Sequence, residues 1–186
     1  MPAHLNRFLP PELSPILLYH RSPMNCSTIQ FKYVDQVSQS DLAQLISLFK
    51  SAAFWACDRS AQDMATAIAH SYPVVTAWDR ERLIGFARAT SDGVFRATIW
   101  DVVIDPHYQG SGLGRKMVET LVSHPHMSRV ERTYLMTTNQ QGFYQRIGFE
   151  ENSSTTMVLY GSKLEPLPSL VRSEPALVDG ECRREV

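Results

Sequence analysis

The sequence predicts a mixed α/β domain built around one central sheet, and three observations carry that prediction. Segments with the spacing of strands and segments with the spacing of helices follow one another between residues 28 and 160. The segment 97–104 is almost continuously apolar, as expected of a strand in the middle of a sheet. Five of the eleven prolines precede residue 28 and three follow residue 160, so regular elements are expected between those positions.

The same pattern divides the chain of 186 residues into three parts. We expect a proline-rich extension over residues 1–27, one folded domain over 28–160, and a flexible tail over 161–186. The first 23 residues contain no sustained apolar stretch of the kind found in secretory signals.

The first elements of the domain are expected to be a strand and two helices. Residues 29–34 suit a strand, and residues 41–53 carry apolar side chains three and four positions apart. Ser40 is placed to cap that helix. Ser60 is placed to cap a second one, in which apolar residues recur at helical spacing over 63–68.

The next elements are expected to be three strands and a third helix. Residues 74–78 and 83–90 flank the polar turn 79–82, which is typical of a hairpin. The apolar strand 97–104 follows, and a glycine-rich loop then leads into a helix. The apolar residues on one face of that helix are Met117, Val118, Leu121 and Val122.

The end of the domain is expected to add a strand over 131–137, a short helix over 141–146 and a last strand over 155–160. No internal repeat is visible in the sequence.

Composition excludes several function classes. Lys and Arg total 18 against 19 Asp and Glu, so bulk positive charge cannot drive nucleic-acid binding. No apolar run approaches the roughly 18 residues that cross a bilayer. The three cysteines form no CxxC pair and the six histidines no HExxH motif. We therefore expect no metal, no nucleic acid and no membrane as partners, and a reducing, cytoplasmic location.

The most informative stretch is a glycine-rich loop, residues 110–114, between an apolar strand and a helix. Glycines let successive backbone N–H groups converge, and the helix start adds partial positive charge, so this loop is suited to hold a phosphate. The spacing differs from the GxGxxG of dinucleotide-binding folds, and the Gly-Lys-Ser/Thr ending of a P-loop is missing. Both of those nucleotide interpretations therefore fail.

Residues 109–114, Gln-Gly-Ser-Gly-Leu-Gly, resemble motif A of the GNAT superfamily of acyl-CoA-dependent N-acetyltransferases, whose pattern is Gln/Arg-x-x-Gly-x-Gly/Ala. Residues 139–149 are similar to motif B of that family, with Asn139 before a helix, Tyr144 on it and a Gly-Phe pair at its end. The order of strands over 29–160 fits as well. The resemblance implies a central mixed sheet of about six to seven strands flanked by about four helices.

Residues 84–93 and 97–102 are similar to the plastid and cyanobacterial GNAT group that includes serotonin N-acetyltransferases. Members of that group acetylate arylalkylamines and, in some cases, protein lysines and N-termini. The resemblance implies acetyl-CoA as co-substrate and a primary amine of one of these kinds as acceptor. It also implies the plastid stroma if the chain comes from a plant or alga. The sequence leaves open whether the protein forms a homodimer. It also leaves open whether the protein is a regulatory module that binds acyl-CoA without turnover.

The resemblance further implies where the cofactor binds. The pyrophosphate would rest on the backbone of the glycine loop, with Arg115 as a charge partner, and the pantetheine arm would pair with the strand edge where the sheet splays apart. The implied cofactor-binding residues are Val102, Val103, Ile104, Gln109, Gly110, Ser111, Gly112, Leu113, Gly114, Arg115, Asn139 and Tyr144.

Tyr144 matches the motif B tyrosine that protonates the leaving thiolate, so it is the predicted general acid, the alternative being a packing role. Asn139 is predicted to hold the CoA arm or a water, the alternative being a helix cap.

Asp101 is the predicted base, because burial in an apolar strand favours proton uptake by a carboxylate. The alternative role of Asp101 is that of a structural partner to an arginine or a backbone N–H. His107 is a second choice for the base.

The three tryptophans, Trp55, Trp78 and Trp100, are expected in the core rather than as a platform for substrate.

Overall fold

The computed structural model describes residues 28–154 and 156–158. The chain divides into two units, Met1–Gly148 and Phe149–Val186, and the fold below is that of residues 28–148. The predicted extension over 1–27 and tail over 161–186 lie outside the described residues, so the three domain boundaries stay predictions.

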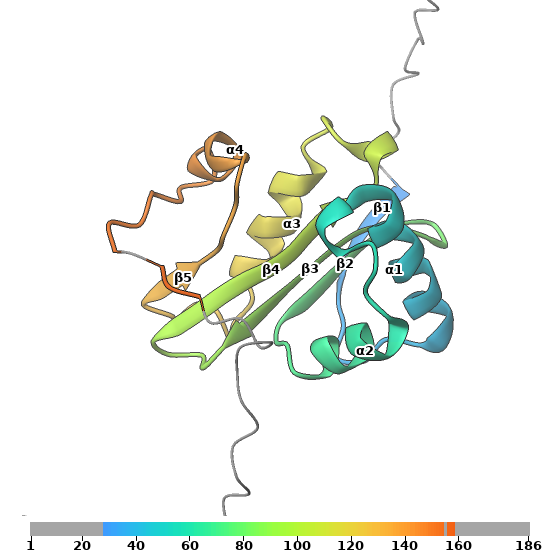
Figure 1. The fold of residues 1–186 in the computed structure, drawn as a ribbon, viewed down its shortest axis with the longest axis horizontal. Coiled ribbons are helices and arrows are strands. Elements are labelled where there is room, and N and C mark those ends of the chain that lie inside the picture. Colours follow the sequence, from blue (N-terminus) through green and yellow to red (C-terminus); the bar gives the residue numbers. More distant parts are fainter. Residues whose placement is uncertain (1–27, 155, 159–186) are drawn as a thin grey trace, which may run out of the picture. The chain divides into compact units, whose positions relative to one another are not determined.

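A five-stranded mixed sheet forms the centre of the first unit (Figure 1). Neighbouring strands run antiparallel except for the last pair, β4 and β5, which are parallel. The mixed sheet confirms the predicted fold class, although the described residues form five strands rather than the expected six to seven. In sheet order the strands are β1 (Ile29–Tyr33), β2 (Val74–Asp79), β3 (Arg82–Ser91), β4 (Arg96–Ile104) and β5 (Arg132–Tyr134).

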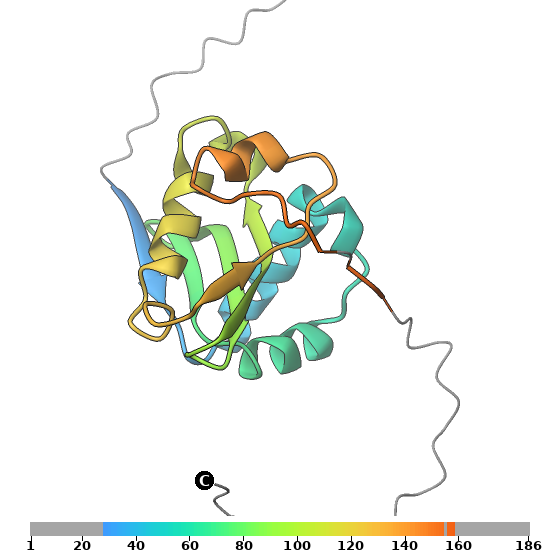
Figure 2. The same cartoon turned by 90° about the vertical axis from the view of Figure 1, so that its left-hand side faces the viewer.

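Four α-helices surround this sheet within the described part of the chain, as predicted. Figure 2 shows α3 on one face of the sheet and α1 with α2 on the other. The helices are α1 (Gln39–Ala52), α2 (Ala61–Ala69), α3 (Leu113–Val122) and α4 (Gln141–Gln145), and two short 3₁₀ helices are η2 (Phe54–Ala56) and η3 (Pro106–Tyr108).

The helix caps follow the sequence closely, with one correction. Ser60 caps α2 as predicted, because its side chain accepts from the N–H of Asp63 at 3.0 Å. The cap of α1 is Ser38 rather than Ser40, and it accepts from the N–H of Asp41 at 3.1 Å. Ser38 has the extended backbone that a cap requires, whereas Ser40 already lies in the first turn of the helix.

The last part of the sheet is shorter than predicted. The expected strand over 131–137 is limited to β5, which pairs with β4 only along Arg96–Thr98. A strand persists only where a neighbour supplies hydrogen bonds, and β5 leaves β4 after Tyr134. Residues 156–158 of the expected final strand have no regular structure, and residues 155, 159 and 160 lie outside the described residues.

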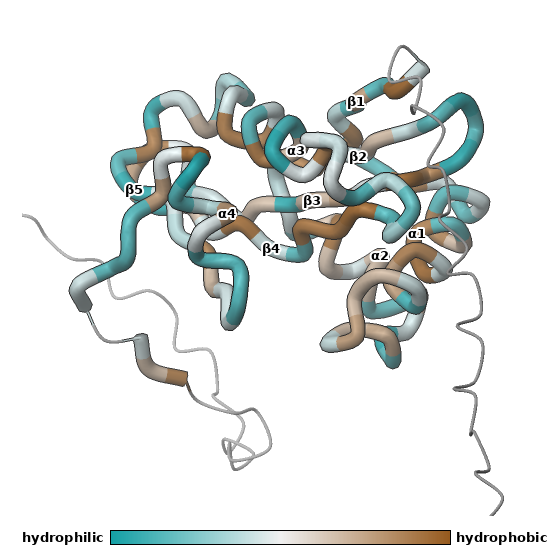
Figure 3. The backbone as a smooth tube through the Cα atoms, turned by 90° about the horizontal axis from the view of Figure 1, so that it is seen from above, coloured by the Kyte–Doolittle hydropathy of each residue, from teal (hydrophilic) through white to brown (hydrophobic). Residues whose placement is uncertain are grey.

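Two apolar layers hold the helices against the sheet. Under α1, the rings of Phe49 and Phe86 meet edge to face with centroids 5.9 Å apart. Under α3, Gly85 permits a close approach, since a Cβ there would lie 2.7 Å from Ile104 Cδ1 and 2.9 Å from Met117 Cε. Figure 3 shows hydrophobic stretches on the strands and on α1, with hydrophilic residues along the connections. Among the described residues, no helix combines the length and apolar character that a membrane crossing needs.

Candidate active site

Beyond Thr98, no strand of the described residues pairs with this edge of β4, because β5 pairs with β4 only along Arg96–Thr98. Asp105 donates its N–H to the carbonyl of Ile84 in β3 at 2.8 Å. Backbone groups alternate in direction along a strand, so the N–H and C=O of Ile104 face away from β3, toward this open edge. The side-chain amide of Gln109 donates to the carbonyl of Ile104 at 2.9 Å.

The glycine loop begins where this open edge ends. Gly110 and Gly112 have left-handed backbones, with φ of 78° and 85°. Gly112 is also the N-cap of α3, and its carbonyl accepts from the N–H of Lys116 at 3.1 Å. Within the described residues, no acceptor bonds to the backbone N–H groups of residues 110–115. Unpaired N–H groups at a helix start are the donors that a pyrophosphate requires.

The space around the loop also suits a bound phosphate. A Cβ built on Gly112 would find no heavy atom within 4 Å, so the backbone is open to a ligand there. The side chain of Arg115 is exposed and pairs with Glu119 one turn later at 2.7 Å. Its predicted role as charge partner of the cofactor stays a prediction.

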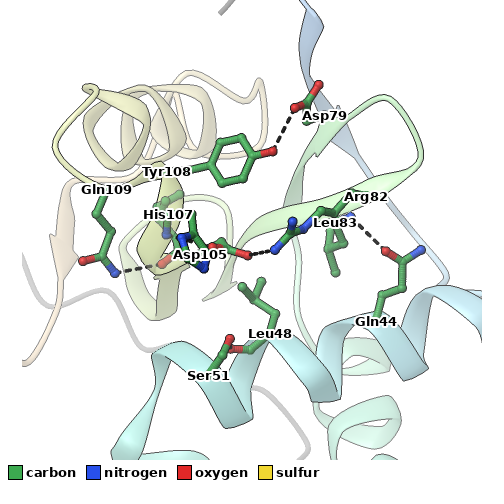
Figure 4. A network of polar contacts seen from close by, with 11 residues as sticks. Gln44, Leu48, Ser51, Asp79, Arg82, Leu83, Asp105, His107, Tyr108 and Gln109 are labelled. Carbon is green, nitrogen blue, oxygen red and sulfur yellow. Dashed lines mark hydrogen bonds and ion pairs between the residues drawn. The ribbon is translucent and has the colours of Figure 1, made fainter. Parts of the chain in front are cut away.

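Two polar links, which the sequence analysis missed, hold η3 and therefore the start of the loop (Figure 4). The buried carboxylate of Asp105 accepts from the N–H of His107 at 2.9 Å and from Arg82 at 2.7 Å. The hydroxyl of Tyr108 donates to Asp79 at 2.8 Å. The Asp105-Pro106 pair is a sequence signal for the hydrogen bond between Asp105 and His107, since aspartate before proline favours a capped turn.

The start of α3 and the helix α4 approach each other closely. A Cβ on Gly114 would lie 3.4 Å from Phe143 Cζ, and the ring of Phe143 meets that of Tyr144 edge to face at 4.9 Å. Tyr144 is half-buried, and this burial raises the pKa of its phenol above the ordinary value. The structure thus brings the predicted acid to the same end of the molecule as the glycine loop.

Asn139 lies exposed in the turn before α4. It does not cap that helix, because the N-cap is Gln140 and no side chain bonds to the first turn. Thr137 instead accepts from the N–H of Gln140 at 3.2 Å. The capping alternative for Asn139 is therefore wrong, while its contact with the cofactor stays a prediction.

Asp101 lies at an irregularity in the β3–β4 register and has a left-handed backbone, with φ of 55°. Its side chain is only 5% exposed, and each oxygen has an arginine partner: Arg59 at 2.8 Å and Arg88 at 2.7 Å. The pairing with arginine, stated above as an alternative, is therefore present, and the base role stays a prediction. His107, the second choice for the base, is exposed on η3.

Neither arginine partner of Asp101 was expected from the sequence. Arg88 stands out as a charge within the apolar run of residues 83–89 in β3, which is a usable signal. It also donates to Ser71 at 3.0 Å, and its guanidinium carbon lies 5.9 Å from the centre of the Trp100 ring. No local pattern marks Arg59, because it meets Asp101 across 42 positions of sequence.

The tryptophans divide into two kinds. Trp78 is buried and donates to Thr76, and Trp100 is half-buried and donates to Thr90, both at 2.9 Å. Trp55 is 55% exposed, so the expectation that all three lie in the core is wrong for this residue. Over the described ranges, no group of three or more His, Cys, Asp or Glu side chains is arranged to hold a metal ion.

Comparisons with known proteins agree with this geometry. Residues 70–151 match the model of the acetyltransferase (GNAT) domain. The chain is 51% identical over 71 residues to GCN5-related N-acetyltransferase 2, chloroplastic, of Arabidopsis thaliana. The aligned segment covers 38% of this chain and 28% of that protein. The chain therefore spans less than a third of the length of that relative.

A second relative is matched over most of its length. This is the uncharacterized N-acetyltransferase ycf52 of Pyropia yezoensis, 33% identical over 131 residues, with 67% of this chain and 74% of that protein covered. A GNAT-family acetyltransferase structure from Streptococcus pneumoniae TIGR4 superposes with a TM-score of 0.59 at 22% identity, covering 71% of this chain and 97% of that one. Because the acetyltransferase (GNAT) domain model matches this chain and 74% of the Pyropia relative is covered at 33% identity, the chain belongs to the GNAT family of N-acetyltransferases.

Proposed function

We propose that this protein transfers the acetyl group of acetyl-CoA to a primary amine by direct attack on the thioester. The observation that carries the proposal is the open edge of β4 running into a glycine loop whose N–H groups lack partners among the described residues. That combination supplies an edge for the pantetheine amides and a cradle for the pyrophosphate. The cofactor-binding residues predicted above all belong to this edge, this loop or the turn and helix beside it.

The chemistry requires a neutral amine and a proton for the departing sulfur. The amine nitrogen bonds to the carbonyl carbon, the carbon–sulfur bond breaks, and the thiolate takes a proton from the Tyr144 hydroxyl. Burial raises the pKa of Tyr144, which supports this role because the phenol then carries its proton throughout the neutral range. Backbone N–H groups along the β4 edge would stabilise the negative charge on the carbonyl oxygen.

Asp101 is the proposed acceptor of the amine's proton. A carboxylate has about four lone-pair sites, so one bond each to Arg59 and Arg88 leaves sites for an amine or a water. Asn139 is proposed to hold the pantetheine arm or that water. These assignments rest on the resemblance of motifs A and B and on the position of Asp101 within β4.

The proposed acceptor is an arylalkylamine such as serotonin, a protein lysine or an N-terminal amine. The proposed location is the cytoplasm of a cyanobacterial cell, or the plastid stroma if the chain comes from a plant or alga. The chloroplastic name of the Arabidopsis relative supports the second of these.

Binding of acetyl-CoA tests the proposal at the loop. Acetyl-CoA should raise the melting temperature of the wild type, because a ligand that binds the folded state stabilises it. Gly112→Asp should abolish that rise by placing a negative charge beside the pyrophosphate. Gly112→Asn is the matched control, with the same shape and tolerance of left-handed backbone but no charge. An Asp variant that folds and is stabilised by acetyl-CoA as strongly as the wild type would contradict the cofactor assignment.

Turnover separates the enzyme from an acyl-CoA-binding regulatory module. An enzyme releases free thiol from acetyl-CoA when serotonin, tryptamine, a polyamine, a lysine peptide or an N-terminal peptide is added. A regulatory module binds acetyl-CoA and releases no thiol with any of them.

A further inference from the structure

An extra residue interrupts β4 opposite the middle of β3. Phe86 and Arg88 lie two positions apart in β3. Their partners in β4, Val103 and Trp100, lie three positions apart, so β4 carries a bulge between them. Asp101 lies in this bulge with φ of 55°, a backbone conformation that residues other than glycine seldom adopt. Such a conformation persists where the surrounding contacts enforce it.

The two arginines that bond to Asp101 differ in burial and in their further contacts. The side chain of Arg88 is 13% exposed, and its Nε donates to one carboxylate oxygen at 2.7 Å. Its Nη1 donates to the buried Ser71 at 3.0 Å, and its guanidinium carbon lies 5.9 Å from the centre of the Trp100 ring. The side chain of Arg59 is 38% exposed, and its Nη1 donates to the other carboxylate oxygen at 2.8 Å.

Arg88 is thereby tied to two elements at once. Ser71 donates to the carbonyl of Ala67 in α2 at 2.6 Å, so the guanidinium links α2 to the bulge of β4. A guanidinium offers several N–H donors in a rigid fork, and a lysine ammonium does not reproduce that geometry. Within the described residues, the guanidinium of Arg59 has no acceptor besides Asp101. One carboxylate oxygen is therefore held by a buried, fixed partner and the other by a partner that solvent reaches.

We propose that Arg88 is a positioning residue of the acetyl transfer, which holds the carboxylate of Asp101 in the orientation that accepts the proton of the amine. The inference rests on the proposed role of Asp101 and deepens it. As the nitrogen–carbon bond forms, the proton passes from the amine nitrogen to the carboxylate. Arg88 keeps its own protons, because a guanidinium stays charged throughout the neutral range, and it acts only through Asp101.

Two variants of Arg88 test the inference through pH–rate profiles, measured as thiol release with each amine of the panel above that supports turnover. Arg88→Lys keeps the charge and loses the fork. It should lower kcat/KM for the amine about tenfold, the cost of a misplaced group, with KM for acetyl-CoA within about twofold of wild type. Arg88→Gln removes the charge as well, so the acidic side of its profile should move to higher pH. A residue that only packs the layer would lower the melting temperature and leave the profile in place.

Arg59→Lys is the matched control, because Arg59 bonds to the same carboxylate from an exposed position. An exposed ion pair contributes little, so kcat/KM should stay within about threefold of wild type. The melting-temperature rise with acetyl-CoA shows that each variant is folded. If Arg88→Gln does not fold, Arg88→Lys carries the test alone.

Wild-type kcat/KM in Arg88→Lys, or an equal loss in Arg59→Lys and Arg88→Lys, would overturn the inference and leave the proposed function intact. An unmoved profile in a folded Arg88→Gln variant would overturn it too. If Asp101→Asn keeps the acidic side of the profile, the proposed role of Asp101 fails and the inference fails with it. Absence of thiol release with every amine would instead overturn the proposed function itself.

Discussion

Tyr144 has the raised pKa and partial burial that suit a proton donor. We expect Tyr144→Phe to lower kcat by about 10²-fold or more, because it removes the donated proton and keeps the ring. The melting-temperature rise with acetyl-CoA should be unchanged. Since the pKa lies above its ordinary value of about 10, wild-type kcat should show no loss from this group below that pH. A fully active phenylalanine variant would rule out the acid assignment.

Asp101 allows a second test at the level of one side chain. If it takes the proton of the amine, Asp101→Asn should lower kcat/KM about 10²-fold and remove the rise of rate with pH on the acidic side of the profile. If Asp101 only ties Arg59 and Arg88 together, the variant should change KM for the amine and keep the shape of the profile. A pH–rate profile for both proteins distinguishes the two roles.

At the scale of elements, the contact between α3 and the sheet depends on Gly85. We expect Gly85→Ala to lower the free energy of unfolding by about 1–3 kcal/mol, because its Cβ would overlap Ile104 and Met117. Gly142→Ala is the control, since the nearest atom to a Cβ there is 3.9 Å away and alanine favours a helix over glycine. Urea unfolding measures both, and a Gly85 variant as stable as wild type would show that the layer repacks without cost.

For the whole molecule, stability toward acid depends on carboxylates paired in the fold. Hydrogen bonds from Thr28 and Tyr108 lower the pKa of Asp79, and backbone N–H groups of Val94 and Arg96 lower that of Asp92. A pKa lower in the folded than in the unfolded state stabilises the fold above the unfolded value, about 3.9. That contribution is lost as the pH falls through the folded value. Stability should therefore decline below about pH 4.

Tyr108→Phe provides the matched measurement, because it removes one donor to Asp79 and keeps the ring. Urea unfolding between about pH 3 and 7 should show a shallower decline for this variant. The same hydrogen bond raises the pKa of Tyr108, so its stabilisation is also lost as the pH rises through that raised value. Parallel curves for the two proteins at low pH would mean that Asp79 takes no part in acid unfolding.

Local patterns in the sequence account for most of the elements and for the two motifs. The apolar periodicity of α1 and α3, the cap at Ser60 and the glycines before α3 are set by residues a few positions apart. Such interactions act within one turn or one hairpin, so the sequence alone predicts them. For the same reason the glycine loop and the helix that carries Tyr144 were predictable as motifs.

Only the tertiary structure decided which residues distant in the chain become partners. Asp101 meets Arg59 and Arg88 across 42 and 13 positions, and β5 ends where it leaves β4. Trp55, an apolar residue by type, is 55% exposed, although Ala53 and Ala56 on either side of it belong to the buried core under α1. Pairing and burial of this kind depend on how elements pack in space, and no local pattern of residue types encodes that packing.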